Sequence, residues 1–166
     1  MLNKQQSLWT IISWALYSWA CDSFGILISS FIFSAYFVKA IATSSSLGTA
    51  QWGWTLAIAA IVTAICAPFL GTMADVSGRR LRFLIFFACA CIICTALLFF
   101  AYPTYHSLYW ALIFFGVASF AYEMGYVFLN SMLKTLASSS YVGRLSGWAW
   151  AMGYFGGIVA LLIALF

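Results

Sequence analysis

Two acidic residues stand near the middle of long apolar stretches, with polar residues at helical spacing. Asp22 follows Ser18 by four residues, and Glu123 precedes Tyr126 by three and Asn130 by seven. On a helix, each set shares one face. A charge at the centre of a bilayer costs about 3 kcal/mol, so such residues usually face a cavity or a partner. All five are therefore candidates for binding a proton or a small solute.

Neither polar set includes Lys or Arg, so no cation within the same helix neutralises Asp22 or Glu123. We expect the two carboxylates to line a central cavity and to bind a proton or a cationic or zwitterionic solute. The structural alternative is a pair of neutral acids that form hydrogen bonds to neighbouring helices.

Composition indicates that these residues lie in lipid. Of the 166 residues, 66% are apolar and 6% are charged, and the mean hydropathy is +1.05. Average soluble domains are nearer 25% charged. A soluble fold of this size could not cover so much apolar surface. The net charge of +4 does not indicate a nucleic-acid partner, because Arg79, Arg80 and Arg82 form the only basic cluster.

The elements that position the carboxylates are predicted to be transmembrane helices. A hydrocarbon core of about 30 Å needs about 20 apolar residues as helix. The sequence predicts an all-α, multi-pass bundle of about five helices in a single domain, 1–166, with helices at roughly 8–38, 52–73, 83–102, 108–133 and 145–166. The first helix is long enough to require tilt. Short loops follow at Ser44–Gly48, Pro103–His106 and Ser138–Ser140.

The basic residues predict the orientation. With the N-terminus in the cytoplasm, only Lys39 falls outside. The cytoplasmic basic residues are then Lys4, Arg79, Arg80, Arg82, Lys134 and Arg144. Positive charge accumulates on the cytoplasmic side of membrane proteins. The sequence therefore predicts a cytoplasmic N-terminus.

The sharpest local motif is GTMADVSGRRLR at residues 71–82, between the second and third predicted helices. Gly71 would let two helices approach closely, and Gly78 permits a tight turn. Asp75 can accept hydrogen bonds, and the arginines can bridge to carboxylates or anionic lipid. An ordinary positive-inside loop would need the arginines but neither the glycines nor the acid.

This motif resembles the loop signature of the major facilitator superfamily, Gly-x-x-x-Asp-x-x-Gly-Arg-Arg/Lys, which lies between the second and third helices. In that family the loop is a latch that stabilises the outward-open state and releases as two halves rock. The resemblance implies a latch role for Gly71, Asp75, Gly78, Arg79 and Arg80.

Further strings resemble the vacuole-effluxer-like branch of this superfamily, across nearly the whole chain. They are WALYSWACDSF at 14–24, WGW at 52–54, YE at 122–123, VFLN at 127–130 and GRLSGWAWAMGYFGG at 143–157. Fungal members of the branch export amino acids from the vacuole, and most bacterial members have no assigned substrate. The resemblance therefore implies transport of a small solute, with an amino-acid-like solute as one expectation.

The chain departs from both family patterns. Val76 stands where many members have a basic latch residue. Ser18, Cys21 and Asp22 stand where the branch usually has Asp, Asn and Ser. The acid is therefore displaced by four residues, one helical turn, along the same face.

Other features indicate packing rather than chemistry. Ala149, Gly153 and Gly157 repeat every four residues, a stripe of small residues for close helix contact. The five cysteines lie in apolar runs without the spacing of a metal site. No nucleophile with a base and no phosphate-binding loop is present. We therefore expect neither an enzyme nor a cofactor.

Transporter halves of this type contain six helices, built as three plus three. We accordingly expect the N-terminal part of an ion-coupled secondary transporter, truncated, in a bacterial inner membrane. One alternative is a subunit that needs a partner chain for the missing helices. Another is a membrane protein without transport activity. The sequence names neither the substrate, the coupling ion nor the direction of transport.

Overall fold

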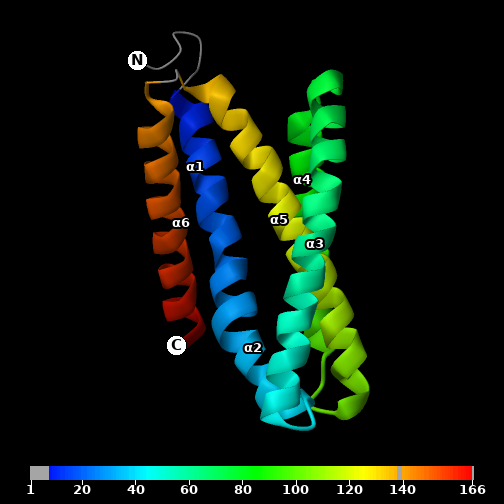
Figure 1. Cartoon of the computed structure of the whole chain (residues 1–166). Helices are drawn as coiled ribbons and strands as arrows, with labels where there is room; N and C mark the ends of the chain where they lie inside the picture. The colour runs from blue at the N-terminus through cyan, green and yellow to red at the C-terminus, as the bar shows by residue number, and fades with distance from the viewer. Residues whose placement is uncertain (1–7, 138–139, 166) are drawn as a thin grey trace. The chain divides into compact units, whose positions relative to one another are not determined.

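The computed structural model describes residues 8–137 and 140–165, with Leu8 and Lys134 described by their backbone alone. The helical elements (Figure 1) are α1 Leu8–Ser23, a π-helix Phe24–Phe31, α2 Ile32–Tyr36, a π-helix Phe37–Ile41, α3 Ser45–Ser77, α4 Arg80–Leu97, the 3₁₀ turns Leu98–Phe100 and Tyr105–Ser107, α5 Leu108–Leu136 and α6 Val142–Leu165. Three positions named above, Lys4, Ser138 and the Lys134 side chain, lie outside the described residues.

Five helical stretches among the described residues are long and apolar enough to cross a membrane, as predicted. They are Trp9–Ile41, Ser45–Ser77, Arg80–Phe100, Tyr105–Leu133 and Val142–Leu165. The largest boundary error concerns the second helix, which begins at Ser45 rather than near residue 52. Its 33 residues correspond to about 50 Å at 1.5 Å per residue, so α3 extends beyond a hydrocarbon core of about 30 Å.

The predicted loop at Ser44–Gly48 is wrong from Ser45 onward. Ser44 is the N-cap of α3, and the helix begins at Ser45. Ser44 has an extended backbone, and its side-chain oxygen accepts a hydrogen bond from the amide of Leu47 at 3.4 Å. Such an N-cap satisfies an amide that has no partner within the helix. Gly48 then packs inside the turn. A Cβ at this position would lie only 2.6 Å from the Ala42 Cβ atom.

The chain forms two compact units, residues 1–32 with 129–166, and residues 33–128. Each unit is described by itself. The prediction of one transmembrane domain over residues 1–166 stays a prediction.

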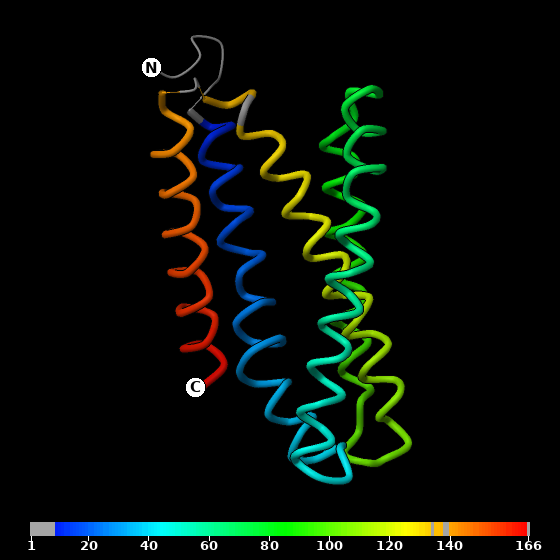
Figure 2. Tube along the Cα trace, in the orientation of Figure 1, coloured from blue at the N-terminus to red at the C-terminus, as the bar shows by residue number. Residues whose placement is uncertain are grey.

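In the first unit, α1 packs along α6. Their traces run side by side in Figure 2. The C-terminal end of α5 joins them through Trp14, whose indole N–H donates to the backbone carbonyl of Leu129 at 3.0 Å. Both residues are buried. The bond satisfies a polar group that burial in an apolar interior would otherwise destabilise.

In the second unit, aromatic rings fill the interior between helices. Trp52 of α3 stacks on Phe115 of α5, with ring centroids 3.6 Å apart and planes 15° apart. Phe87 of α4 stacks on Phe128 of α5 at 5.7 Å. The Tyr36 hydroxyl donates to the Ala101 carbonyl at 2.8 Å. These contacts bring helices distant in sequence together.

The first membrane-spanning stretch is not a uniform α-helix. From Phe24 to Phe31, and again from Phe37 to Ile41, it is a π-helix. The Ser30 hydroxyl donates to the Gly25 carbonyl at 2.9 Å, five residues earlier. Such turns are rare and often occur near functional positions. Here the π-helix begins two residues after Asp22.

Candidate functional site

The Asp22 carboxylate lies against α6. Asp22 is partly exposed on α1, and Ser18, one turn earlier, is 3% exposed. A Cβ at Gly153 would overlap the Asp22 Oδ2 atom and lie 2.8 Å from its Cγ. Only glycine therefore leaves room for the carboxylate in this position. The close contact of Gly153 with Asp22 was not predicted from the sequence.

Two further glycines of α6 receive side chains of the first membrane-spanning stretch in the same way. A Cβ at Gly156 would overlap the Trp19 indole, and one at Gly157 would overlap the Ile26 side chain. The expected packing stripe is thus confirmed at Gly153 and Gly157. Gly156 was missed because it falls outside the four-residue repeat.

Ser18 and Asp22 lie together on the α-helical part of the first membrane-spanning stretch. Helical spacing predicts that Asp22 and Ser18 share one face, and both lie in α1. Past Ser23 the helix has π geometry, so α-helical spacing no longer determines which residues share a face. Propensity gives no signal for such a change.

The second polar set lies on α5, where its members differ in exposure. Glu123 and Asn130 are exposed, and Tyr126 is half-buried. Ser119, one turn before Glu123, is 4% exposed, and its hydroxyl has no hydrogen-bond partner among the described residues. Glu123 therefore lies at the surface of its unit rather than in its packed interior.

Within the described part of the chain, Glu123 forms no ion pair. An exposed carboxylate on a membrane-spanning helix needs water, a cation or a polar partner, because lipid tails supply none of these. Asp22 and Asn130 belong to the first compact unit, and Glu123 and Tyr126 to the second. The expected central cavity lined by both carboxylates stays a hypothesis.

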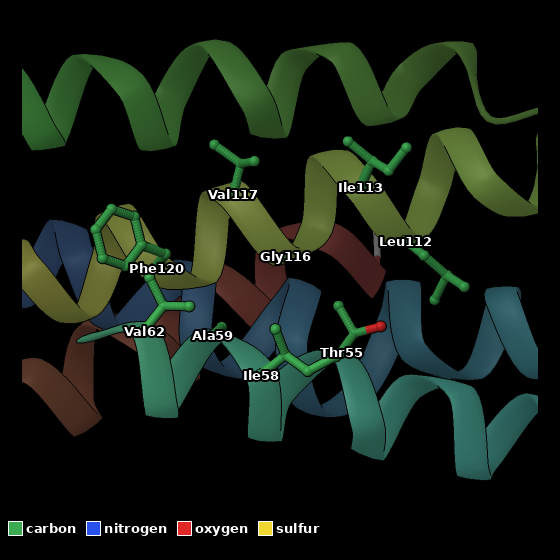
Figure 3. A pocket seen from close by; sticks show the side chains of 9 residues that line it. All are labelled: Thr55, Ile58, Ala59, Val62, Leu112, Ile113, Gly116, Val117 and Phe120. Carbon is green, nitrogen blue, oxygen red and sulfur yellow. The ribbon is translucent and has the colours of Figure 1, made fainter. Parts of the chain in front are cut away.

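An apolar groove of about 430 Å³ lies between α3 and α5 in the second unit (Figure 3). From α3 it is lined by Thr55, Ile58, Ala59 and Val62, and from α5 by Leu112, Ile113, Gly116, Val117 and Phe120. This groove was not predicted from the sequence. Gly116 leaves space in this groove because it has no side chain. A Cβ there would stand 3.1 Å from the Thr55 Cγ2 atom.

The predicted latch motif forms the junction of two helices rather than a long loop. Gly71 and Asp75 lie in the last turns of α3, which ends at Gly78. Gly78 has φ +63°, and its amide donates to carbonyls of the last turn. This left-handed conformation favours glycine at a helix C-terminus. The expectation of a loop over residues 74–82 is therefore wrong, because α3 continues to Ser77 and α4 begins at Arg80.

An ion pair spans this junction. The Arg80 Nε donates to the Asp75 Oδ1 atom at 2.6 Å, and both side chains are partly exposed. Arg79 and Arg82 instead lie with Phe83 and Phe86 along a groove of about 360 Å³. Arg80 thus pairs with Asp75, while Arg79 is exposed.

The close helix approach expected at Gly71 stays a prediction. A Cβ at Gly71 would meet no described atom within 4 Å, apart from its own helix.

Comparison with known proteins decides the family. The model of the Major Facilitator Superfamily matches residues 1–161. The chain belongs to the major facilitator superfamily. The five membrane-spanning stretches agree with this membership, since they are consistent with a part of the family's fold. The resemblance to the vacuole-effluxer-like branch stays a prediction.

A curated relative in the superfamily is the uncharacterized MFS-type transporter YxiO of Bacillus subtilis (strain 168). It is 30% identical over 165 residues, which is 98% of this chain. The chain spans 37% of the relative's length. No solved structure matches the chain significantly. Membership of this superfamily and the five membrane-spanning stretches show a multi-pass membrane protein.

Proposed function

We propose that the chain is the N-terminal part of an ion-coupled secondary transporter in which Asp22 and Glu123 carry the coupling. The observation behind this proposal is that Asp22 and Glu123 stand well inside membrane spans that hold no arginine, whereas Asp75 lies at the end of its span and pairs with Arg80. A charge at such a position is costly unless a function or a partner offsets that cost. A carboxylate that is protonated or binds a cation loses this cost, so binding of the ion can be coupled to transport.

The two carboxylates have different surroundings, which supports different tasks. Asp22 lies in the contact between α1 and α6, where it is partly shielded. Glu123 is exposed and unpaired by any described residue. We assign proton coupling to Asp22, and contact with solute to Glu123 together with Tyr126 and Asn130. Ser18 supports Asp22 from one turn earlier on α1.

The conformational part of the proposal rests on the junction of α3 and α4. Alternating access in secondary transporters occurs largely by rocking of rigid parts. The ion pair of Arg80 with Asp75 and the left-handed turn at Gly78 connect α3 to α4 at this junction. Arg79, exposed beside them, is then free to contact a part that moves during transport.

The remaining features of the proposal follow from composition and resemblance. We place the protein in a bacterial inner membrane with its N-terminus in the cytoplasm, because basic residues accumulate on that side. An amino-acid-like solute and export from the cell are consistent with the branch it resembles. Further helices of the complete transporter, from the same or a partner chain, complete the path.

The test of ion coupling uses the complete transporter in proteoliposomes. Solute accumulation is measured under an inward proton gradient, an inward sodium gradient and no gradient, with an ionophore as control. We expect accumulation to depend on one of the two gradients. Accumulation that is unaffected by either gradient contradicts ion coupling.

The test of assembly uses affinity purification from native membranes. If a partner chain supplies helices, it will co-purify at a fixed stoichiometry. If the tagged product is itself longer and no other chain accompanies it, the helices belong to one polypeptide.

A further inference from the structure

One face of α5 carries both the apolar groove and the Glu123 carboxylate. At 100° per residue, Gly116, Phe120 and Glu123 fall within about 60° of one another around the helix. Gly116 and Phe120 line the groove, and Glu123 follows Phe120 by three residues. The carboxylate therefore stands about 5 Å further along the same face, at 1.5 Å per residue.

The groove itself offers almost no polar group. Of the side chains that line it, only Thr55 carries a hydroxyl, and this hydroxyl donates to the Gln51 carbonyl at 2.9 Å. Its volume of about 430 Å³ is within the range of small-molecule sites. An occupant gains by burying apolar surface and finds no donor for a carboxylate or phosphate of its own.

Aromatic rings flank Glu123 on both sides. Phe120 precedes it by three residues and Tyr126 follows by three. Neighbouring rings hold both in place: Phe87 lies edge-on to Phe120 at 5.9 Å, and Tyr122 lies edge-on to Tyr126 at 5.1 Å. A carboxylate with aromatic rings about one helical turn before and after it is suited to an organic cation, because carboxylates and aromatic rings both attract positive charge.

We propose that this face of α5 binds an organic cation with an apolar body, the body in the groove and the charge at Glu123. The inference rests on the proposed transport function and, of the cationic and zwitterionic solutes expected at Glu123, selects a cationic one in place of a zwitterionic amino acid. A solute anion would meet only repulsion from Glu123, because no basic side chain lines the groove. A lipid tail could fill the groove but would leave the carboxylate without a counter-charge.

The test measures binding directly, using the complete protein in nanodiscs of zwitterionic lipid. Equilibrium dialysis with tetraphenylphosphonium as probe is compared with the isosteric anion tetraphenylborate, and empty nanodiscs correct for partition into lipid. The variants are Glu123→Gln, Glu123→Asp and Gly116→Leu. Gly53→Leu on α3 is the matched control, since a Cβ there would meet no described atom within 4 Å.

We expect the phosphonium to bind saturably, and the borate not to. Glu123→Gln should weaken phosphonium binding at least ten-fold and Glu123→Asp should retain most of it. Gly116→Leu should weaken binding while Gly53→Leu does not. Circular dichroism shows whether each variant is folded. If Gly116→Leu does not fold, phosphonium binding by Glu123→Gln alone tests the inference.

Three results overturn the inference: no saturable binding, equal binding of both ions, or unchanged binding in Glu123→Gln. Phosphonium binding should also be competed more strongly by an amine than by the apolar zwitterionic amino acid from which it derives by decarboxylation. Equal competition by the two contradicts the inference. If phosphonium binding is unchanged in Glu123→Gln but gradient-driven accumulation is lost, the proposed function stands and this inference fails. If binding depends on Glu123 but no gradient drives accumulation, this inference stands and the proposed ion coupling fails.

Discussion

The carboxylate of Asp22 on α1 occupies the space where Gly153 of α6 lacks a side chain. A Cβ at position 153 would overlap one carboxylate oxygen, and it would lie 3.5 Å from the Ser18 carbonyl oxygen. Position 153 therefore controls where the Asp22 side chain can point. A change at Gly153 tests the role of Asp22 without removing the acid.

We expect Gly153→Ala to lower gradient-driven transport by roughly ten-fold or more, because displacement of a reacting group by about 1 Å can cost up to about 100-fold. The carboxylate is the end of a short side chain and can rotate away, so the helices should still pack. Gly147→Ala on the same helix is the control, since a Cβ there would meet no described atom within 4 Å.

Labelling of the carboxyl by a hydrophobic carbodiimide gives a second measurement, independent of transport. We expect the reactivity of Asp22, followed by peptide mass spectrometry, to change in Gly153→Ala and to stay the same in Gly147→Ala. Equal labelling and equal transport in both variants would show that Gly153 does not position the acid.

Trp14→Phe should destabilise the first unit. The substitution removes the indole N–H and leaves the Leu129 carbonyl without this donor. Loss of one partner of a buried hydrogen bond costs about 1–3 kcal/mol. Thermal unfolding in detergent should therefore occur at a lower temperature. Trp148→Phe, at a side chain 66% exposed, is the matched control, and an equal shift in both variants argues against a role for the bond.

Substitution by alanine should lower the stability at Gly78 and raise it at Gly71. Gly78 has φ +63°, and a side chain in the left-handed region costs about 1–2 kcal/mol. Gly71 is inside a helix with open space around it, where alanine is favoured by about 0.5–1 kcal/mol. Stability measured on both variants checks this. Loss of stability in Gly71→Ala would reveal a contact with a part of the protein outside the described residues.

The Asp75–Arg80 pair should matter more for transport than for folding. Both side chains are partly exposed, and exposed ion pairs contribute about 0–1 kcal/mol to stability. A double-mutant cycle with Asp75→Asn and Arg80→Gln should therefore give a small coupling energy in unfolding. The same cycle on transport rates should give a larger coupling if the junction is a latch. Coupling that is equal in both measurements contradicts the latch role.

The membrane-spanning segments could be predicted from the sequence because they depend on composition and length. Helix ends were harder, since they depend on single residues. Ser44 begins α3 through its side-chain cap, although a run of serines with Gly48 usually indicates a loop. The predicted end of the second helix at residue 73 is four residues early, because the chain remains helical as far as Ser77.

The candidate site could be predicted residue by residue but not in its contacts. Asp22 and Glu123 stand out as acids in apolar runs. That Asp22 faces Gly153 depends on the rotation of two helices, which spacing in one helix does not determine. The π-helix after Ser23 has no sequence signal and displaces every residue that follows on that face.

The most direct measurement of the central claim is to compare solute counterflow with gradient-driven accumulation in Asp22→Asn and Glu123→Gln, reconstituted as the complete transporter. Counterflow needs binding and alternating access but no ion coupling. The account predicts that Asp22→Asn retains counterflow and loses gradient-driven accumulation, while Glu123→Gln weakens both. Full gradient-driven accumulation in both variants would contradict it, because neither carboxylate would then carry a proton or bind the solute.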